Sequence, residues 1–208
     1  MNNWNMGINA GEIVILQFEL IEKWHSVEPP DEINDPSLEQ TMLYIISNNL
    51  CNYKLWHEED FARRRDVKDS EIATVKRNID GWNQKRNDFI EKIDDFVISE
   101  WQDSIKMTEN AGQNSETIGS IIDRLSILNL KIFHMAEMVE VYPQKLQFSD
   151  KLAILHQQRD DLGDSLKNLI SDISKGNRYI KTYRQMKMYN DPETNPQLNK
   201  TLRNKTGE

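Results

Sequence analysis

The sequence of 208 residues contains a single cysteine, Cys51, which excludes a disulfide framework and a zinc site built from cysteine clusters. Only eight glycines and six prolines interrupt the chain, and this scarcity favours long helices over a strand-and-turn architecture. Apolar runs such as Ile13–Leu16 are far shorter than the roughly 20 residues of a membrane-spanning helix. The first residues lack the basic and apolar stretches of a secretory signal. We therefore expect a cytoplasmic protein without transmembrane insertion.

Acidic residues outnumber basic ones, with 34 Asp and Glu against 26 Lys and Arg, which leaves a net charge of −8. Because an acidic chain repels the phosphate backbone, this balance argues against nucleic acid as a partner. The length and the 38% hydrophobic content suit one domain with one core. We expect a single helical domain over residues 1–189 and a disordered polar tail over residues 190–208.

Apolar residues recur every three or four positions through most of the chain, which is the period of an amphipathic helix. Ser37, Ser115 and Ser149 suit the starts of three helices, and Asp69 or Ser70 suits the start of another. The pattern predicts five helices, at about residues 9–24, 37–65, 69–106, 115–142 and 149–189, with a loop at 109–114. Short connections place neighbouring helices antiparallel. The predicted fold class is all-α, a single compact bundle of about five long, mostly antiparallel helices.

The third predicted helix carries a regular heptad seam that includes one charged residue. Its seam positions alternate steps of three and four, as in a packed helix interface, and Arg86 occupies one of them. A buried guanidinium needs acceptors, because an unpaired buried charge costs several kcal/mol. Two interpretations stay open. Arg86 belongs to a ligand site, or it pairs with Glu59, Asp60 or Asp123 in a structural network.

Three blocks in the middle of the chain carry many of these polar residues. They read LWHEEDFAR at 55–63, KRNIDGWNQKRND at 76–88 and SETIGSIIDRLSIL at 115–128. Over roughly residues 40–140 the chain resembles a bacterial family known only as a domain of unknown function, with departures at Phe61, Trp82 and Ile118. The family's members are all-helical, and their genes often lie near those for envelope polysaccharides or glycosyltransferases. The resemblance implies one shared site in these blocks and names no reaction.

Imidazole and carboxylate groups share helix faces in two places. His57 and Asp60 are three residues apart, as are His134 and Glu137, so each pair lies on one face of its helix. We expect His57, Glu59 and Asp60 to hold a divalent metal, Mg²⁺ or Mn²⁺, because short acidic spacings suit ions that keep several waters. The alternative is that these groups satisfy one another inside the bundle.

Arginine and asparagine residues in the same blocks favour a phosphorylated ligand. Guanidinium groups bind phosphate oxygens bidentately, and asparagine amides can read the edge of a base or sugar. We expect a phosphorylated small molecule (a nucleotide, a sugar phosphate or a nucleotide sugar) in a polar cleft between the second, third and fourth helices. The candidate ligand-binding residues are Arg63, Lys76, Asp80, Asn83, Arg86, Asn87, Asp123 and Arg124.

Two classes of function stay open. A metal-assisted hydrolase or transferase would use the catalytic candidates His57, Glu58, Glu59 and Asp60, with His57 as acid or base. A non-catalytic protein would use the same polar residues to sequester a ligand or to order a scaffold. The heptad seam with its one charge also suits a homodimer interface. The last predicted helix ends in a basic stretch, so peripheral contact with a membrane surface is a further alternative.

Overall fold

The structure is a computed structural model that describes residues 8–101, 105–184 and 191–199. Its elements along the chain are α1 (Ala10–Ser26), α2 (Gln40–Phe61), α3 (Asp69–Trp101), β1 (Gly112–Asn114), α4 (Ile118–Val141), α5 (Leu146–Ser174) and β2 (Arg178–Ile180). The predicted all-α bundle of five helices is confirmed. The two short strands were not expected.

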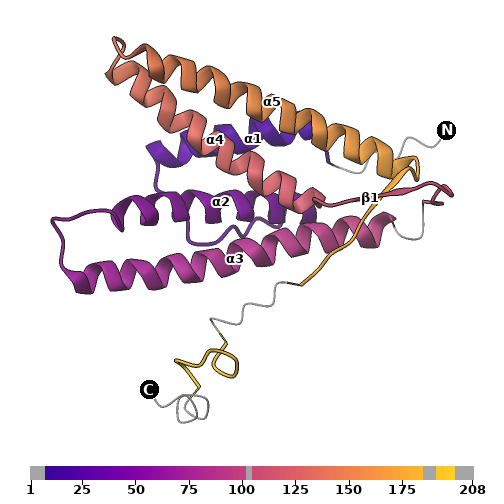
Figure 1. The fold of residues 1–208 in the computed structure, drawn as a ribbon, viewed down its shortest axis with the longest axis horizontal. Helices are drawn as coiled ribbons and strands as arrows, with labels where there is room; N and C mark the ends of the chain where they lie inside the picture. Colours follow the sequence, from indigo (N-terminus) through magenta and orange to yellow (C-terminus); the bar gives the residue numbers. More distant parts are fainter. Residues whose placement is uncertain (1–7, 102–104, 185–190, 200–208) are drawn as a thin grey trace.

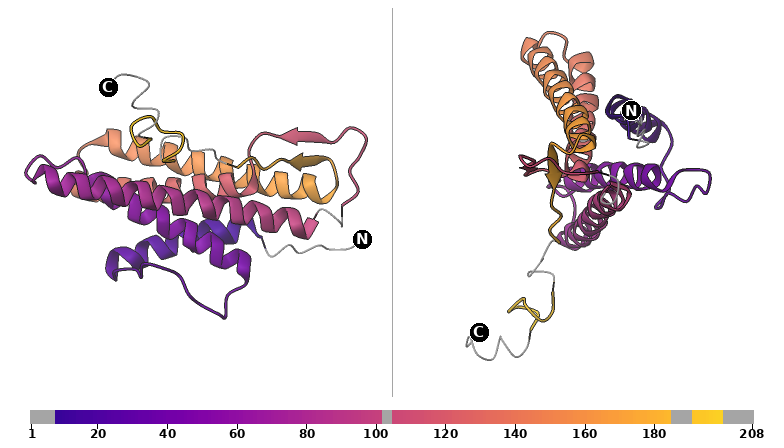
Figure 2. Two further views of the ribbon diagram at one scale, coloured as in Figure 1. Left: turned by 90° about the horizontal axis from the view of Figure 1, so that it is seen from below. Right: turned by 90° about the vertical axis from the view of Figure 1, so that its right-hand side faces the viewer.

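α4 is the central helix of the bundle, because it contacts each of the other four helices. α2 and α3 form one antiparallel pair and α4 and α5 form another, each joined by a short connection (Figure 1). α1 packs against α4 and α5. The end-on view in Figure 2 (right) shows that α1 and α3 lie on different sides of the bundle. The main core cluster draws on all five helices and includes Ile13, Ile45, Ile93, Ile122 and Leu166. This packing brings the polar blocks of α2, α3 and α4 together.

Three predicted helix starts are wrong by about three residues. α5 begins at Leu146 rather than at residue 149, with Lys145 at its N-cap position. Ser37 does not cap α2; its hydroxyl and backbone N–H donate to Asp35 in the preceding turn, at 2.6 and 2.9 Å. α2 therefore begins only at Gln40. At α4, Thr117 and Ser120 form a reciprocal capping box, so this helix starts after Thr117 rather than at residue 115.

The predicted continuation of the fifth helix past Gly176 is wrong over residues 175–184. Gly176 has a φ of +72°, a left-handed conformation that ends helices. Its backbone N–H donates to Ile173 at 2.8 Å, and the chain then leaves the helix axis. β2 pairs in parallel with β1, which forms inside the stretch predicted as a loop. The two strands tie the segment after α5 to the segment that leads into α4.

Basic side chains after α5 bind acidic residues of the bundle. Arg184 donates to Glu91 and Asp95 on α3, at 2.8 Å each, and Arg178 lies 3.3 Å from Asp172. The basic helix end expected as a membrane contact does not form over residues 175–184, and residues 185–190 lie outside the described residues. None of the described helices is long and apolar enough to cross a bilayer. Of the predicted tail, residues 191–199 form short turns, and residues 190 and 200–208 lie outside the described part.

The start of α4 docks directly onto α3. Asp94 is 3% exposed and its carboxylate accepts from the backbone N–H of Gly119 at 2.7 Å. A Cβ at Gly119 would lie 2.5 Å from the carbonyl oxygen of Ile90, so only glycine allows this approach. Burial raises the pKa of Asp94 to about 6, although its hydrogen bonds with Thr117 and Gly119 act in the opposite direction.

Gly119→Ala should lower the free energy of unfolding by about 1–3 kcal/mol, because the added methyl group overpacks the contact between α4 and α3. Gly81→Ala is the matched control, since Gly81 is helical with nothing within 4 Å of its Cβ position. The control should be neutral or stabilise by up to about 1 kcal/mol. Urea unfolding followed by circular dichroism measures both. Equal effects of the two substitutions would contradict the close approach.

Asp94→Asn should stabilise the protein in a pH-dependent way. The folded pKa of Asp94, about 6, lies above its ordinary value of 3.8, so the native state binds more protons between these values. The free energy of unfolding of the wild type therefore falls as pH rises through this window, by about 2–3 kcal/mol relative to the asparagine variant. Urea unfolding at pH 4 and pH 8 measures the difference. A constant gap between the two proteins would show that Asp94 does not titrate in this range.

Candidate functional site

A buried carboxylate, Asp123 on α4, lies at the centre of the polar residues of the bundle. Its side chain is 6% exposed and accepts from the amides of Asn48 and Asn52 on α2, at 3.0 and 2.9 Å. The Nε of Arg86 on α3 lies 3.3 Å from the same carboxylate oxygen. Of the acceptors considered for Arg86 in the sequence, Asp123 is therefore the one that the structure pairs with it. Three helices meet at one charge.

The hydrogen bonds continue from α2 to α1 and along α4. Ser126 donates to Asn49 at 2.6 Å, and Asn49 donates to the backbone oxygen of Gln17 at 3.1 Å. Gln17 in turn donates to the backbone oxygen of Ile122 at 3.0 Å. We call the six side chains of this set the asparagine network: Gln17, Asn48, Asn49, Asn52, Asp123 and Ser126. The sequence analysis missed Asn48 and Asn52 as members, and the available signal was a polar run inside an otherwise apolar helix.

A cleft of about 290 Å³ opens between α2, α3 and α4 beside this network. We call it the arginine cleft. Two arginines, two carboxylates and one amide from the predicted site line it, together with Asn52 and apolar residues. It is lined by Asn52, Leu55, Trp56, Glu59, Asp60, Arg63, Asn83, Arg86, Ile127 and Leu130.

The two arginines of the cleft differ in how firmly they are held. Arg63 is 69% exposed and pairs with Glu59 one turn earlier, at 2.9 Å. Arg86 is 28% exposed, anchored by Asp123, and its Nη1 lies 3.5 Å from the amide oxygen of Asn83. Within the described part of the chain, Asp123 and Asn83 are the acceptors beside Arg86, and its buried Nε makes no hydrogen bond, so the guanidinium, with five N–H donors, retains donor capacity.

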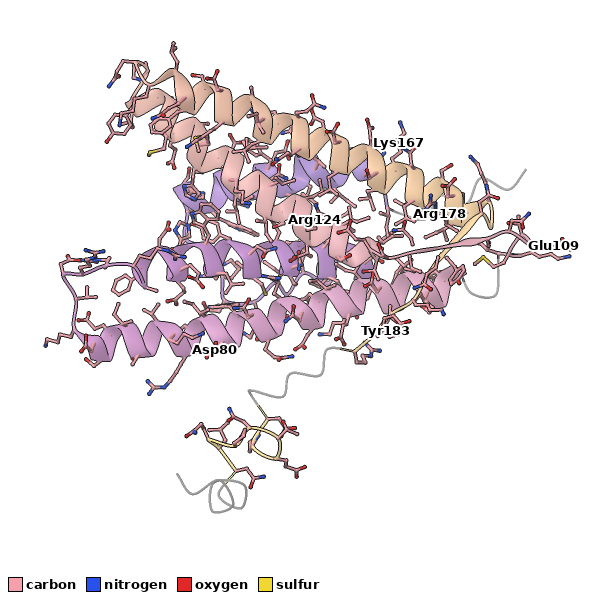
Figure 3. The ribbon with its side chains drawn as sticks, viewed as in Figure 1. Asp80, Glu109, Arg124, Lys167, Arg178 and Tyr183 are labelled. Atoms are coloured by element: carbon pink, nitrogen blue, oxygen red, sulfur yellow. The ribbon has the colours of Figure 1, made fainter. Side chains whose placement is uncertain are left out.

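The remaining predicted ligand and catalytic residues lie outside the arginine cleft. Glu58 accepts from Asn78 on α3 at 2.9 Å. Lys76 and Asp80 pair with each other at 2.7 Å along α3. Figure 3 labels Asp80 on this helix. Arg124 pairs with Glu116 and lines a separate hollow of about 680 Å³ between α4 and α5. Asn87 is buried in α3. The structure thus gathers Glu59, Asp60, Arg63, Asn83 and Arg86 around one cleft, with Asp123 behind them.

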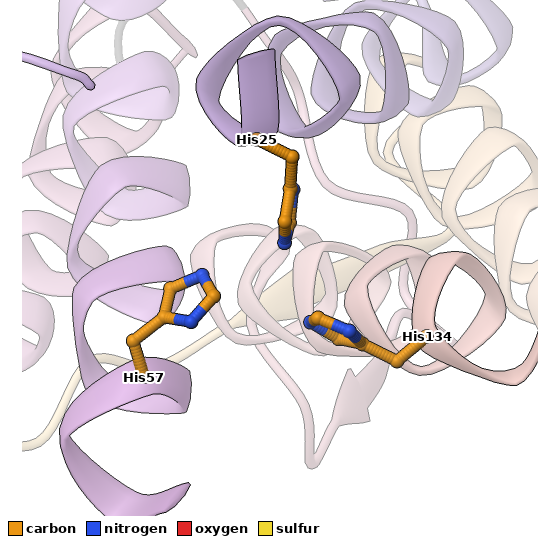
Figure 4. A group of neighbouring side chains, drawn as sticks. All are labelled: His25, His57 and His134. Carbon is orange, nitrogen blue, oxygen red and sulfur yellow. The ribbon is translucent and has the colours of Figure 1, made fainter. Parts of the chain in front are cut away.

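His57 faces two other histidines instead of the cleft. Its ring centroid lies 5.1 Å from that of His25 on α1 and 5.9 Å from that of His134 on α4. The rings of His25 and His134 are 5.0 Å apart. Figure 4 shows the three side chains converging from three helices, and we call them the histidine cluster. The sequence analysis missed His25, because its partners lie on two other helices and nothing adjacent in the chain marks it.

The nitrogen atoms of the cluster fall into two groups. Nδ1 of His25 contacts the backbone oxygen of Ile21 at 2.7 Å, and Nδ1 of His134 contacts a carboxylate oxygen of Glu137 at 2.8 Å. All three Nε2 atoms are buried and have no hydrogen-bond partner among the described residues. At least one potential ligand nitrogen from each residue lies within 4.8 Å of those of the other two.

Burial and mutual repulsion lower the pKa values of two histidines of the cluster, His25 and His57. Desolvation lowers the pKa of His57, and the neighbouring His25 and His134 lower it further. Desolvation also lowers the pKa of His25, more than its hydrogen bond to Ile21 raises it. These two imidazoles therefore favour the neutral form, in which one ring nitrogen carries a free lone pair.

Trp56 connects the histidine cluster to the arginine cleft. Its ring stacks on His134 with centroids 4.8 Å apart and planes inclined by 8°, and the same residue lines the cleft. A polar cleft that can take an anion and a set of imidazole nitrogens that can take a metal therefore adjoin each other in one part of the bundle.

Comparison with known proteins identifies the family of the chain but assigns no activity to it. No curated protein matches the chain, and neither does any solved structure. The model of one family matches residues 42–182, which include α3, α4, α5 and nearly all of α2, and hence the whole arginine cleft and two of the three histidines. The chain belongs to this family, which is described as a protein of unknown function (DUF4254).

Proposed function

We propose that this protein binds a phosphorylated small molecule, such as a nucleotide, a sugar phosphate or a nucleotide sugar, in the arginine cleft. The observation that carries the proposal is the position of Arg86 and the contacts of its guanidinium group. Asp123 and Asn83 lie 3.3 and 3.5 Å from its guanidinium, and Arg86 lines a cleft of about 290 Å³. A pre-oriented guanidinium fork matches the oxygens of a phosphate group.

The charges of the cleft favour binding of the phosphate together with a divalent cation. Arg63 and Arg86 are balanced by Glu59 and Asp60, so the walls alone supply no excess positive charge for an anion. Mg²⁺ or Mn²⁺ would supply that charge, since these ions are commonly held by one or two carboxylates together with the oxygens of a bound phosphate. Glu59 and Asp60 are the carboxylates in reach of such an ion.

Metal-assisted hydrolysis or group transfer is the enzymatic form of this proposal, and sequestration of the ligand is its non-catalytic form. In the enzymatic form the cation polarises a phosphoryl oxygen, and Arg86 stabilises the charge that develops on the phosphate. Product analysis after incubation with the ligand and Mg²⁺ separates the two forms.

A structural role for the same residues is the second candidate. The observation that favours it is the compensation of Asp123 inside the bundle, where one carboxylate oxygen receives two amide hydrogen bonds and lies beside the charge of Arg86. In a scaffold or a homodimer, the pair of Arg86 and Asp123 would fix helix register without binding any ligand.

Arg86→Lys should weaken ligand binding by about 10–100-fold, because it keeps a charge opposite Asp123 but loses the planar fork. Arg124→Lys is the matched control, since Arg124 lies on α4 but lines a different hollow. Thermal shift with Mg²⁺ and nucleotides, sugar phosphates or nucleotide sugars measures both variants. A ligand at 100 times its dissociation constant adds about 2.7 kcal/mol to the stability of the wild type.

Two results would overturn the proposed function. The first is the absence of any shift for the wild type with every phosphorylated compound, with and without Mg²⁺ or Mn²⁺. The second is an equal loss of the shift in the Arg86 and Arg124 variants, which would place the ligand outside the arginine cleft.

Arg86→Met tests the structural candidate. Removing the guanidinium leaves Asp123 buried without its counter-charge, so the free energy of unfolding should fall by about 2–4 kcal/mol. Arg86→Met combined with Asp123→Asn removes both charges and should recover most of that loss. Urea unfolding of the single and double variants measures the difference. If the double variant is as unstable as the single one, the pair does not act as a buried ion pair.

A further inference from the structure

The histidine cluster leaves three nitrogen atoms without a partner at the same place. The described residues contain six buried side-chain nitrogen or oxygen atoms that lack a hydrogen-bond partner, and three of them are Nε2 of His25, His57 and His134. An unsatisfied buried polar group costs about 1–3 kcal/mol. Three such groups, contributed by three helices and facing one another, point to a common ligand that accepts three lone pairs.

We propose that His25, His57 and His134 bind a divalent transition metal ion of the zinc class through their Nε2 atoms. This centre joins α1, α2 and α4 (Figure 4). It shares His57 with the Mg²⁺ or Mn²⁺ site expected from the sequence but has His25 and His134 in place of the carboxylates of Glu59 and Asp60, and it therefore takes a different class of metal. It stands independently of ligand binding in the arginine cleft.

Hydrogen bonds at Nδ1 leave the correct nitrogen free to bind a metal. A carbonyl oxygen and a carboxylate oxygen can only accept, so Nδ1 of His25 and Nδ1 of His134 each carry the proton. In a neutral imidazole the lone pair is then on Nε2. Histidines that ligate metals almost always donate their other N–H to a carbonyl or a carboxylate in this way. The backbone oxygen of Ile21 and the carboxylate of Glu137 therefore orient the rings of His25 and His134 for metal binding.

The ligand set selects the class of metal. Imidazole nitrogen suits zinc, copper, iron and nickel, whereas magnesium and calcium prefer oxygen. Three histidines with an open fourth position form the ligand set of a catalytic type of zinc site, in which water or a ligand atom completes the tetrahedron.

The positions of the rings require only a small adjustment. The three residues offer nitrogen atoms within 4.8 Å of one another. Tetrahedral ligands at about 2.0–2.1 Å from zinc are about 3.3 Å apart, so rotations that shorten the separations by roughly 1.5 Å at most would close the site.

The surroundings of the cluster support a bound cation. Glu137 contacts His134 directly, and Asp60 and Glu28 lie close enough to His57 to act electrostatically on it. These carboxylates favour a positive charge at the centre. Phe133 stacks on His25 with centroids 4.0 Å apart, and Tyr53 packs edge-on against His57 at 4.5 Å. The aromatic walls hold the rings in place and limit access by water.

The first test uses the full-length wild type, stripped with a chelator and dialysed against Zn²⁺, Co²⁺ or Mg²⁺. We expect about one zinc ion per chain after gel filtration, measured by atomic emission, and a rise in melting temperature with Zn²⁺. Co²⁺ should give the intense visible absorption of a low-coordinate nitrogen site. Mg²⁺ should neither compete with Co²⁺ nor shift the melting temperature through this cluster.

The second test uses variants with a matched control. His25→Gln removes a ligand and should lower the zinc affinity by more than 100-fold, whereas Glu137→Gln removes an outer-shell partner and should lower it by about 10–100-fold. His156→Gln is the control, because His156 lies on α5 outside the cluster. It should bind zinc as the wild type does. Competition with a chromophoric chelator measures the affinities, and circular dichroism verifies the fold of each variant.

Three outcomes would overturn the metal centre. In the first, the wild type binds no stoichiometric zinc. In the second, added Co²⁺ gives only the weak spectrum of the hydrated ion. In the third, the His25→Gln variant binds zinc as tightly as the His156→Gln control. The cobalt spectrum decides the matter on the wild type even when a variant fails to fold. His25 does not line the arginine cleft, so a phosphorylated ligand with Mg²⁺ should still stabilise His25→Gln. Failure of one proposal is thereby distinguished from failure of the other.

Discussion

The charge of Asp123 must be compensated inside the bundle, and the arrangement of the helices follows from how this is done. A carboxylate with 6% of its side chain exposed receives hydrogen bonds from two asparagines of α2 and the charge of Arg86 from α3. Sliding α2 or α3 along α4 by one turn would separate these donors from the carboxylate. Apolar packing tolerates such a slide far better than a buried charge does, so the polar contacts specify the register that the apolar core only stabilises.

The register set at Asp123 also positions both candidate sites. The same turn of α3 that brings Arg86 to Asp123 brings Asn83 to the cleft, and α2 carries Asn52 in the network, Trp56 at the cleft and His57 in the cluster. α1 is held in position against α2 by the hydrogen bond that Asn49 donates to the backbone oxygen of Gln17. His25 lies further along this helix. The two candidate sites therefore share one set of helix positions.

The sequence predicts the helices well because their period is local, and it predicts Arg86 as an anomaly because a guanidinium on a heptad seam is visible without coordinates. It also restricts the partner of Arg86 to three acids, of which Asp123 is the one found. It does not predict the pairing of β1 with β2, since three-residue strands carry little pattern and depend on the turn at Gly176. The sequence does not predict the role of His25 either. Its role arises only where three helices cross, and no spacing along one helix encodes that crossing.

Two kinds of cation chemistry lie on the two sides of Trp56. The arginine cleft offers carboxylate oxygens and guanidinium groups, which suit a hydrated hard cation that travels with a phosphate. The histidine cluster offers buried imidazole nitrogens among aromatic rings, which suit a borderline ion that sheds most of its water. The stacking of Trp56 on His134 joins them rigidly. A metal ion in the cluster would fix the ring of His134, which stacks on Trp56 in the wall of the cleft, so the two proposed sites adjoin each other without sharing a ligand residue.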